Sequence, residues 1–142
     1  MIEKKQENCP VIKFKDIDEA NRYLEEWKKK LFLTDWIIKI NLCEKHEMPI
    51  EDACGANQIN DMAKWCNISI LKDNDEPSIE KFCHEEILVH ELMHCKLIPL
   101  IEEPENIEQN YYNIGQHALI EQISKSLIMA KYGIDFDWFY AQ

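Results

Sequence analysis

Residues 90–94, which read HELMH, constrain this chain more than any other part of its sequence. On a helix, His90 and His94 lie one turn apart, with their Cβ atoms about 6 Å from each other on one face. Their imidazoles can therefore converge on one tetrahedral zinc ion. Glu91 follows the first histidine, so its carboxylate lies beside the ion and can take a proton from a water molecule that the metal has acidified. The pattern predicts one zinc ion per chain, with a general base next to it.

The residues around the motif predict the helix that it requires. Apolar residues recur at helical spacing over residues 79–98, Ser78 can cap the N-terminus, and Pro99 can end the helix. Apolar neighbours of the motif, at 87–89 and 97–98, favour burial of this helix and exclusion of water from around the metal. The alternative is a pair of core histidines that hydrogen-bond within the protein.

A third protein ligand has to come from another part of the chain, because catalytic zinc sites use three protein ligands and leave one position for water. The extension that supplies a third histidine in metzincins is absent, since Leu97 and Leu100 stand at its glycine and histidine positions. A second long helix is predicted over residues 107–132, ended by Gly133. We expect this helix to supply the ligand.

His117 and Glu121 are the two candidates on that helix, and they lie four residues apart on one face. We favour Glu121, since Ala118 and Ser124 on either side of it are small and would let the two helices approach closely. His117 would then be a partner of a ligand or a group that acts on the transition state. In the alternative, His117 is the third ligand and Glu121 orients it.

Other residues could also belong to a site. Tyr111 and Tyr112 could place a phenol near a tetrahedral oxyanion, a role that zinc peptidases often need, although core packing is commoner for tyrosine. His46 and His84 have no partner at metal-binding spacing, so we expect surface or structural roles for them. Cys95 directly follows the second motif histidine but points about 100° away from it around the helix, which predicts packing.

The rest of the chain predicts an α+β fold. Residues 16–33 have the spacing of an amphipathic helix capped by Asp16, residues 36–42 and 64–71 read as strands, and a third short strand is predicted near 56–59 in a segment that otherwise resembles a loop. The aromatic segment 134–140 should pack back on the body. We expect a single domain over residues 1–142, with a mostly antiparallel or mixed sheet of two to four strands beside three principal helices.

Composition excludes several function classes. The formal net charge of −11 would repel a nucleic acid. No apolar run approaches the length that spans a bilayer, and the N-terminus lacks the apolar core of a signal peptide, so we expect a cytoplasmic protein that binds no membrane. Six cysteines without a CxxC pair predict reduced, mostly buried thiols.

The order of strands, HExxH helix and later glutamate resembles a gluzincin, a type of zinc metallopeptidase, in a minimal form. Residues 35–40, 67–70 and 86–94 resemble small metallopeptidases found in phages and prophages, and the resemblance covers roughly residues 35–131. It implies a zincin-like fold, a zinc ion, Glu91 as general base and Glu121 as third ligand. It also implies a strand near the site, here residues 65–71, that can pair with an extended peptide substrate.

Three functions fit these expectations. The first is a zinc peptidase that hydrolyses a peptide bond in a peptide or protein, and the second is a zinc hydrolase of a non-peptide amide. The third is an interaction or structural protein in which zinc serves as a staple. Glu91 argues against the third, because a closed structural zinc site does not need a base.

Overall fold

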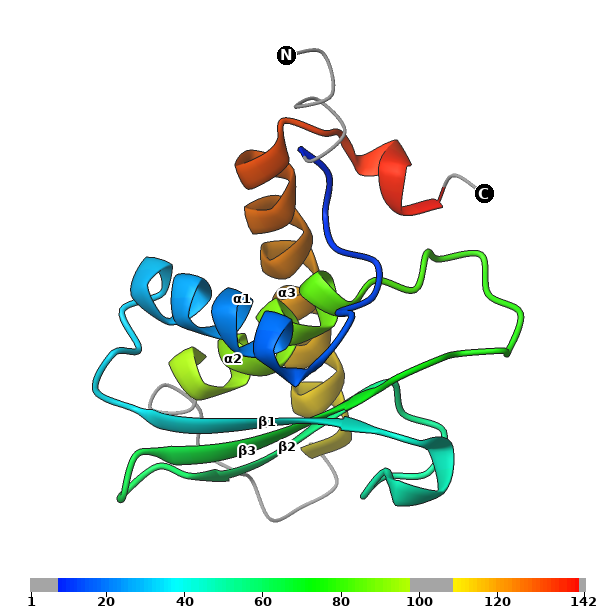
Figure 1. Ribbon diagram of the computed structural model, residues 1–142. Helices are drawn as coiled ribbons and strands as arrows, with labels where there is room; N and C mark the ends of the chain where they lie inside the picture. The colour runs from blue at the N-terminus through cyan, green and yellow to red at the C-terminus, as the bar shows by residue number, and fades with distance from the viewer. Residues whose placement is uncertain (1–7, 98–108, 141–142) are drawn as a thin grey trace.

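The computed structural model describes residues 8–97 and 109–140, with the side chains of the second range described from residue 116 onward. It is an α+β structure with three α-helices and a mixed three-stranded sheet (Figure 1). In chain order the elements are α1 (Ile17–Lys30), β1 (Ile37–Cys43), the 3-10 helix η2 (Lys45–Glu47), β2 (Gly55–Asn60), β3 (Trp65–Leu71), α2 (His84–Leu97), α3 (Gln109–Tyr132) and the 3-10 helix η4 (Phe136–Tyr140). The predicted fold class is confirmed at this level.

The sheet has the strand order β1-β3-β2. β1 runs parallel to β3, with Ile37 opposite Trp65, and β2 runs antiparallel to β3, with Gly55 opposite Ile70. β3 is therefore the central strand, and both of its edges are hydrogen-bonded. The expectation that residues 65–71 pair with an extended peptide is wrong for this reason, because a peptide can add only to an edge strand.

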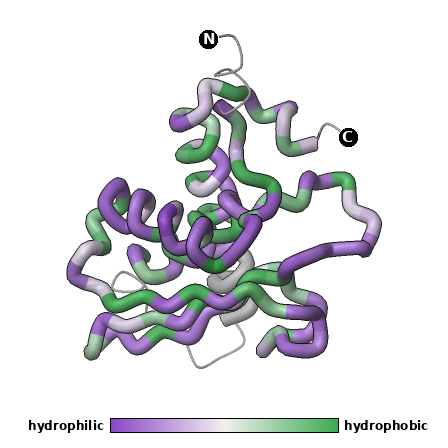
Figure 2. Tube along the Cα trace, viewed as in Figure 1, coloured by the Kyte–Doolittle hydropathy of each residue, from purple (hydrophilic) through white to green (hydrophobic). Residues whose placement is uncertain are grey.

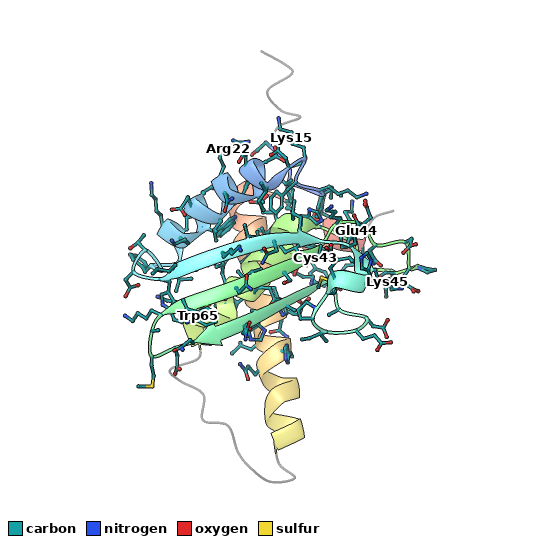
Figure 3. The ribbon with its side chains drawn as sticks, turned by 60° about the horizontal axis from the view of Figure 1, so that its bottom comes forward. Lys15, Arg22, Cys43, Glu44, Lys45 and Trp65 are labelled. Atoms are coloured by element: carbon teal, nitrogen blue, oxygen red, sulfur yellow. The ribbon has the colours of Figure 1, made fainter. Side chains whose placement is uncertain are left out.

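The core lies between the sheet and the helices α1 and α2. Hydrophobic and hydrophilic positions alternate along the strands (Figure 2), as expected for a sheet with one face covered. The central strand contributes Cys66, Ile68 and Ile70 to the covered face, and all three are at most 1% exposed. In Figure 3 the opposite face comes forward, and α3 passes behind the sheet and extends beyond its β2 edge.

The motif helix α2 is buried almost all round, since nine of its 14 residues are buried. It starts at His84, five residues later than predicted, and Ser78 is not its cap, because the Ser78 hydroxyl accepts a hydrogen bond from the Glu80 amide. The amides of His84 and Glu85 instead donate to the backbone carbonyls of residues 11–12, over 2.9 and 3.1 Å. These carbonyls satisfy first-turn N–H groups that a capping side chain usually satisfies. The predicted start was wrong because this partner is distant in sequence.

The side chain of Glu85 ties α2 to three other segments. Its carboxylate is fully buried and accepts hydrogen bonds from the Val11 amide (3.0 Å), Trp27 Nε1 (2.9 Å), Lys131 Nζ (2.7 Å) and the Tyr132 hydroxyl (2.5 Å). A buried carboxylate is tolerated only when such partners surround it. The four donors come from the N-terminal segment, α1 and α3, so Glu85 fixes α2 against all of them.

His84 makes a second link of this kind. The Phe14 amide donates to His84 Nδ1 at 2.9 Å, and Nε2 lies 2.9 Å from the Leu71 carbonyl oxygen, so the ring is neutral with its proton on Nε2. Burial lowers the pKa of His84, which favours the same neutral form. The prediction of a structural role for His84 is confirmed.

The other helix ends follow local rules. Asp16 caps α1 by accepting from the Glu19 amide at 2.8 Å, as predicted. The helix ends at Lys30, earlier than predicted, because Phe32 adopts a left-handed conformation and the Leu33 amide returns to the Lys28 carbonyl. No glycine marks this end, so the sequence carries little signal for it.

The C-terminal part of the chain agrees with the sequence analysis. α3 ends at Tyr132 and Gly133 follows with a φ of 65°, as predicted. The aromatic segment forms η4 and buries Phe139 completely, which confirms that it packs on the body. The predicted connection at 100–106, the first residues of the predicted helix 107–132, and Pro99 lie outside the described residues.

The sequence predicts reduced, mostly buried cysteines and no membrane-spanning segment. All six cysteines lie in the described ranges and are free thiols; Cys43, Cys66, Cys83 and Cys95 are buried. Within the described ranges, no helix combines the length and the apolar character needed to cross a bilayer.

Replacing Glu85 by glutamine should lower the free energy of unfolding by about 3 kcal/mol, because one amide oxygen cannot accept from all four donors and the amide NH₂ would face other donors. Urea denaturation measures this change. Glu25→Gln on α1, where the side chain is 63% exposed, is the matched control and should change stability by less than about 0.5 kcal/mol. Equal effects of the two substitutions would show that the carboxylate is not an anchor.

Candidate metal centre

Three histidines converge at the interface of α2 and α3. His90 and His94 are both on α2, and their ring centroids are 5.2 Å apart. His117 on α3 brings a third ring, 6.1 Å from that of His90 and 5.0 Å from that of His94. One nitrogen from each ring lies within 4.8 Å of the others, so the three could hold a metal ion. The first two rings are partly buried and the third is exposed.

The packing of α3 on α2 brings His117 and Glu121 to the motif, as predicted. Ser124 is fully buried, in agreement with the prediction that a small residue lets the helices approach. Ala118 is exposed and does not contribute to this approach. The expected role of Ala118 was therefore wrong, because its position on α3 turns away from the buried face.

The Glu121 carboxylate contacts the Nδ1 atom of His90. Its Oε1 is 2.5 Å from His90 Nδ1, and its Oε2 accepts a hydrogen bond from Lys125 Nζ at 2.6 Å. A carboxylate on Nδ1 holds the ring orientation and leaves Nε2 available to a metal, as is common for histidine ligands. The alternative prediction has Glu121 orient His117, whereas here it contacts His90.

The prediction that Glu121 is itself the third ligand stays a prediction. Glu121 belongs to a second group of potential ligands, with Glu86 and His90, whose atoms also lie within 4.8 Å of one another. Among the residues with described side chains, no such group contains both His94 and Glu121. The geometry thus brings His117, and not Glu121, together with both motif histidines.

The neutral form of His94 and the ionised form of Glu121 suit metal binding, whereas a metal ion has to displace a proton from His90. Burial, together with the neighbouring His90 and His117, lowers the pKa of His94 to about 4, so the ring is neutral at pH 7 and can donate a lone pair. Burial opposes the charged form of His90, but Glu121 and Glu91 outweigh it and raise its pKa. The hydrogen bond from His90 and, against the effect of burial, that from Lys125 lower the pKa of Glu121 to about 2, so this carboxylate is ionised.

Glu91 lies beside the histidines and belongs to neither group of potential ligands, which fits the role predicted for it. Its Oε1 accepts a hydrogen bond from Asn57 Nδ2 on β2 at 2.5 Å. Burial raises the pKa of Glu91, while His90 and Asn57 act in the opposite direction. A carboxylate with a raised pKa is a better proton acceptor near pH 7.

Gly55 lets β2 approach the motif helix. A Cβ atom at this position would lie 2.6 Å from Ile87 Cγ2 and 2.9 Å from Glu91 Oε2, so no larger residue fits without movement. Gly55 and Asn57 are two residues apart on β2 and therefore face the same way, toward α2. Sequence reasoning missed both roles because it assigned most of residues 43–62 to a loop. A glycine and an asparagine at alternate positions before Ile59 were the available signal.

A cavity of about 230 Å³ opens next to His90 and Glu91, and Glu86 lies in its wall. Burial and the nearby Glu121 raise the pKa of Glu86 to about 7. On the acidic side of the cavity, the Lys125 ammonium group forms ion pairs with Glu121 and with Glu80. No sequence pattern points to Glu80, Glu86 or Lys125 as site residues, since the segment that brings Glu80 to α3 has no pattern of its own.

The remaining candidates lie elsewhere or are not described. Tyr111 and Tyr112 are on α3, but their side chains lie outside the described part of the chain, so the oxyanion role stays a prediction. His46 is exposed in η2, and Cys95 is buried at 1% exposure, in agreement with surface and packing roles.

Comparison with protein family models, with curated proteins and with solved structures gives no match for this chain. The assignment of the site therefore depends on its own geometry.

Gly55→Ala should lower the free energy of unfolding by about 1–3 kcal/mol, because the added methyl overlaps Ile87. A double-mutant cycle with Ile87→Ala, which removes the Cγ2 atom, tests the contact by urea denaturation. We expect the double variant to lose less stability than the sum of the two single variants. Additive losses would show that β2 does not approach α2 this closely.

Proposed function

We propose that this chain is a zinc-dependent peptidase with a minimal zincin-like domain. In this proposal His90, His94 and His117 hold the ion and Glu91 is the general base. The observation that carries it is the convergence of three imidazoles beside a carboxylate that is not needed as a ligand. Three nitrogen ligands with one position open to water are the pattern of catalytic zinc.

The choice of His117 over Glu121 is supported by the contacts that Glu121 already makes. Glu121 holds the Nδ1 atom of His90 and pairs with the ammonium group of Lys125, whose side chain is only 7% exposed. Moving the carboxylate onto an ion would take one partner from a buried cation, which is costly. His117 is exposed and can turn toward the other two rings at little cost.

A zinc ion held by these three imidazoles would supply a Lewis acid and would lower the pKa of a water molecule. The protein's own part is to move the proton. Asn57 occupies Oε1 of Glu91, so Oε2 is the atom left to accept the proton from the attacking water and to pass it to the leaving amine. Burial of Glu91 favours the protonated carboxyl that this transfer produces.

A peptide is favoured over another amide by the position of β2. Among the described residues β2 is an edge strand that pairs with β3 alone, and it carries Gly55 and Asn57 against the motif helix. An extended peptide that adds to this edge would lie beside Glu91. The substrate strand predicted from sequence thus becomes β2 in this proposal, in place of the central strand.

Zinc affinity separates the two choices of third ligand. Competition with a chromophoric chelator should give one zinc per wild-type chain, and His90→Ala, His94→Ala and His117→Ala should each lose the ion. Glu121→Ala should keep it with an affinity about 10–100-fold weaker, as expected for a residue that orients a ligand. The exposed His46→Ala is the matched control. Retention by His117→Ala with loss in Glu121→Ala would make Glu121 the ligand.

Glu91→Gln should bind zinc normally and cleave unfolded protein or peptide substrates at least about 100-fold more slowly, because the proton acceptor is gone. Peptide cleavage is followed by mass spectrometry, with Glu25→Gln as the matched control. If the zinc-loaded wild type cleaves no peptide but hydrolyses a small amide, the substrate class is wrong. If it hydrolyses neither, the zinc is structural.

A further inference from the structure

The cavity next to the candidate metal centre has an acidic wall. Its carboxylates come from the turn before α2, from α2 and from α3, and they are Glu80, Glu86, Glu91 and Glu121. The one lysine in the lining is Lys81, whose ammonium group lies over the ring of Trp138, 4.3 Å from its centroid. Lys125 stands behind the wall and pairs with three of the carboxylates. Four carboxyl groups are thus gathered at this cavity with two ammonium groups and the His90 imidazole.

A zinc ion at the proposed site would not contact Glu80 or Glu86 directly. In the proposed site His90 would hold the ion through Nε2, because Glu121 already contacts Nδ1. The imidazole ring would then stand between the ion and Glu121, whose carboxylate lies within 4.8 Å of that of Glu86. Lys125 pairs directly with Glu80, so Glu86 is the carboxyl group of this wall that remains without a close cation.

Glu86 lacks a close partner. Its side chain is 8% exposed, and among the described residues its carboxylate makes no hydrogen bond and one long ion pair, 3.9 Å from Lys125 Nζ. Buried carboxylates are almost always hydrogen-bonded or paired at close range. An oxygen of Glu86 is therefore available in the cavity wall for a donor that carries positive charge.

The cavity is suited to one side chain of a substrate. Its volume of about 230 Å³ holds a single long side chain, and Phe82, Cys83 and Ile87 give it an apolar part next to the carboxylates. Lysine and arginine side chains bury an apolar stem and place their charge on a polar partner. Glu91 lines the same cavity, so the residue held there would be next to the bond that is cleaved.

We propose that this cavity selects substrates with a positively charged group beside the scissile bond, held by Glu86 with the help of Glu80. This proposal rests on the proposed peptidase function, but binding of the cationic group can be measured without catalysis. The group is a lysine or arginine side chain or a free amino terminus, which share the same chemistry.

Binding of small probes to the zinc-loaded Glu91→Gln protein, followed by NMR titration, tests the proposal. The probes are Nα-acetyl-lysine methylamide, norleucine methylamide with its free amino group, and the neutral Nα-acetyl-norleucine methylamide. At least one cationic probe should bind at least ~10-fold more tightly than the neutral probe, which corresponds to about 1.4 kcal/mol. The tighter cationic probe identifies a side chain or an amino terminus as the source of the charge.

The preference should fall below ~3-fold when Glu86→Gln or Glu80→Gln is added, and it should persist with the exposed Glu25→Gln. Equal binding of neutral and cationic probes, no binding of any probe, or an unchanged preference in both cavity variants would overturn the proposal. So would a second metal ion bound by Glu86 and Glu121 that excludes the lysine probe. Failure of the peptidase function would instead show as absent zinc or absent cleavage, which these titrations do not measure.

Discussion

The buried carboxylate of Glu85 is the interaction on which the placement of the motif helix depends. α2 is buried on most sides and has no single apolar face, so hydrophobic contact alone would permit more than one rotation of the helix. Glu85 removes this freedom, because its four donors come from fixed positions on other segments. His90 is five residues further on and therefore points about 140° away around the helix. One satisfied charge in the core thus directs the motif histidines outward, toward α3.

The anchor and the site are also joined through α3. Lys131 and Tyr132 near its C-terminus hold Glu85, while His117, about 22 Å back along the helix, joins the motif histidines. The same helix therefore sets both the orientation of α2 and the third imidazole. On the other side, Gly55 brings β2 against α2, and this contact places the Asn57 amide on the general base. The site is assembled by three elements that are distant in sequence.

The motif and the fold class could be predicted from sequence because their signals are local. Helix α1 has its own cap and apolar spacing, and the HELMH pattern implies its own geometry. The start of α2 could not be predicted, since its first amides are satisfied by carbonyls some 70 residues away. Glu121 could not be assigned to His90 for a related reason: the spacing of residues on α3 defines a face but not which atom of α2 that face meets. The role of Glu86 depends on a cavity that only the packed structure defines.

A crystal structure of the zinc-loaded protein, with anomalous scattering recorded at the zinc edge, tests the central claim most directly. The account predicts one zinc peak, bonded to Nε2 of His90 and to the rings of His94 and His117 at about 2.0–2.1 Å, with one position open toward Glu91. It also predicts that Glu121 remains on Nδ1 of His90. A zinc ion bonded to Glu121, an ion with four protein ligands, or the absence of zinc from this interface would contradict the account.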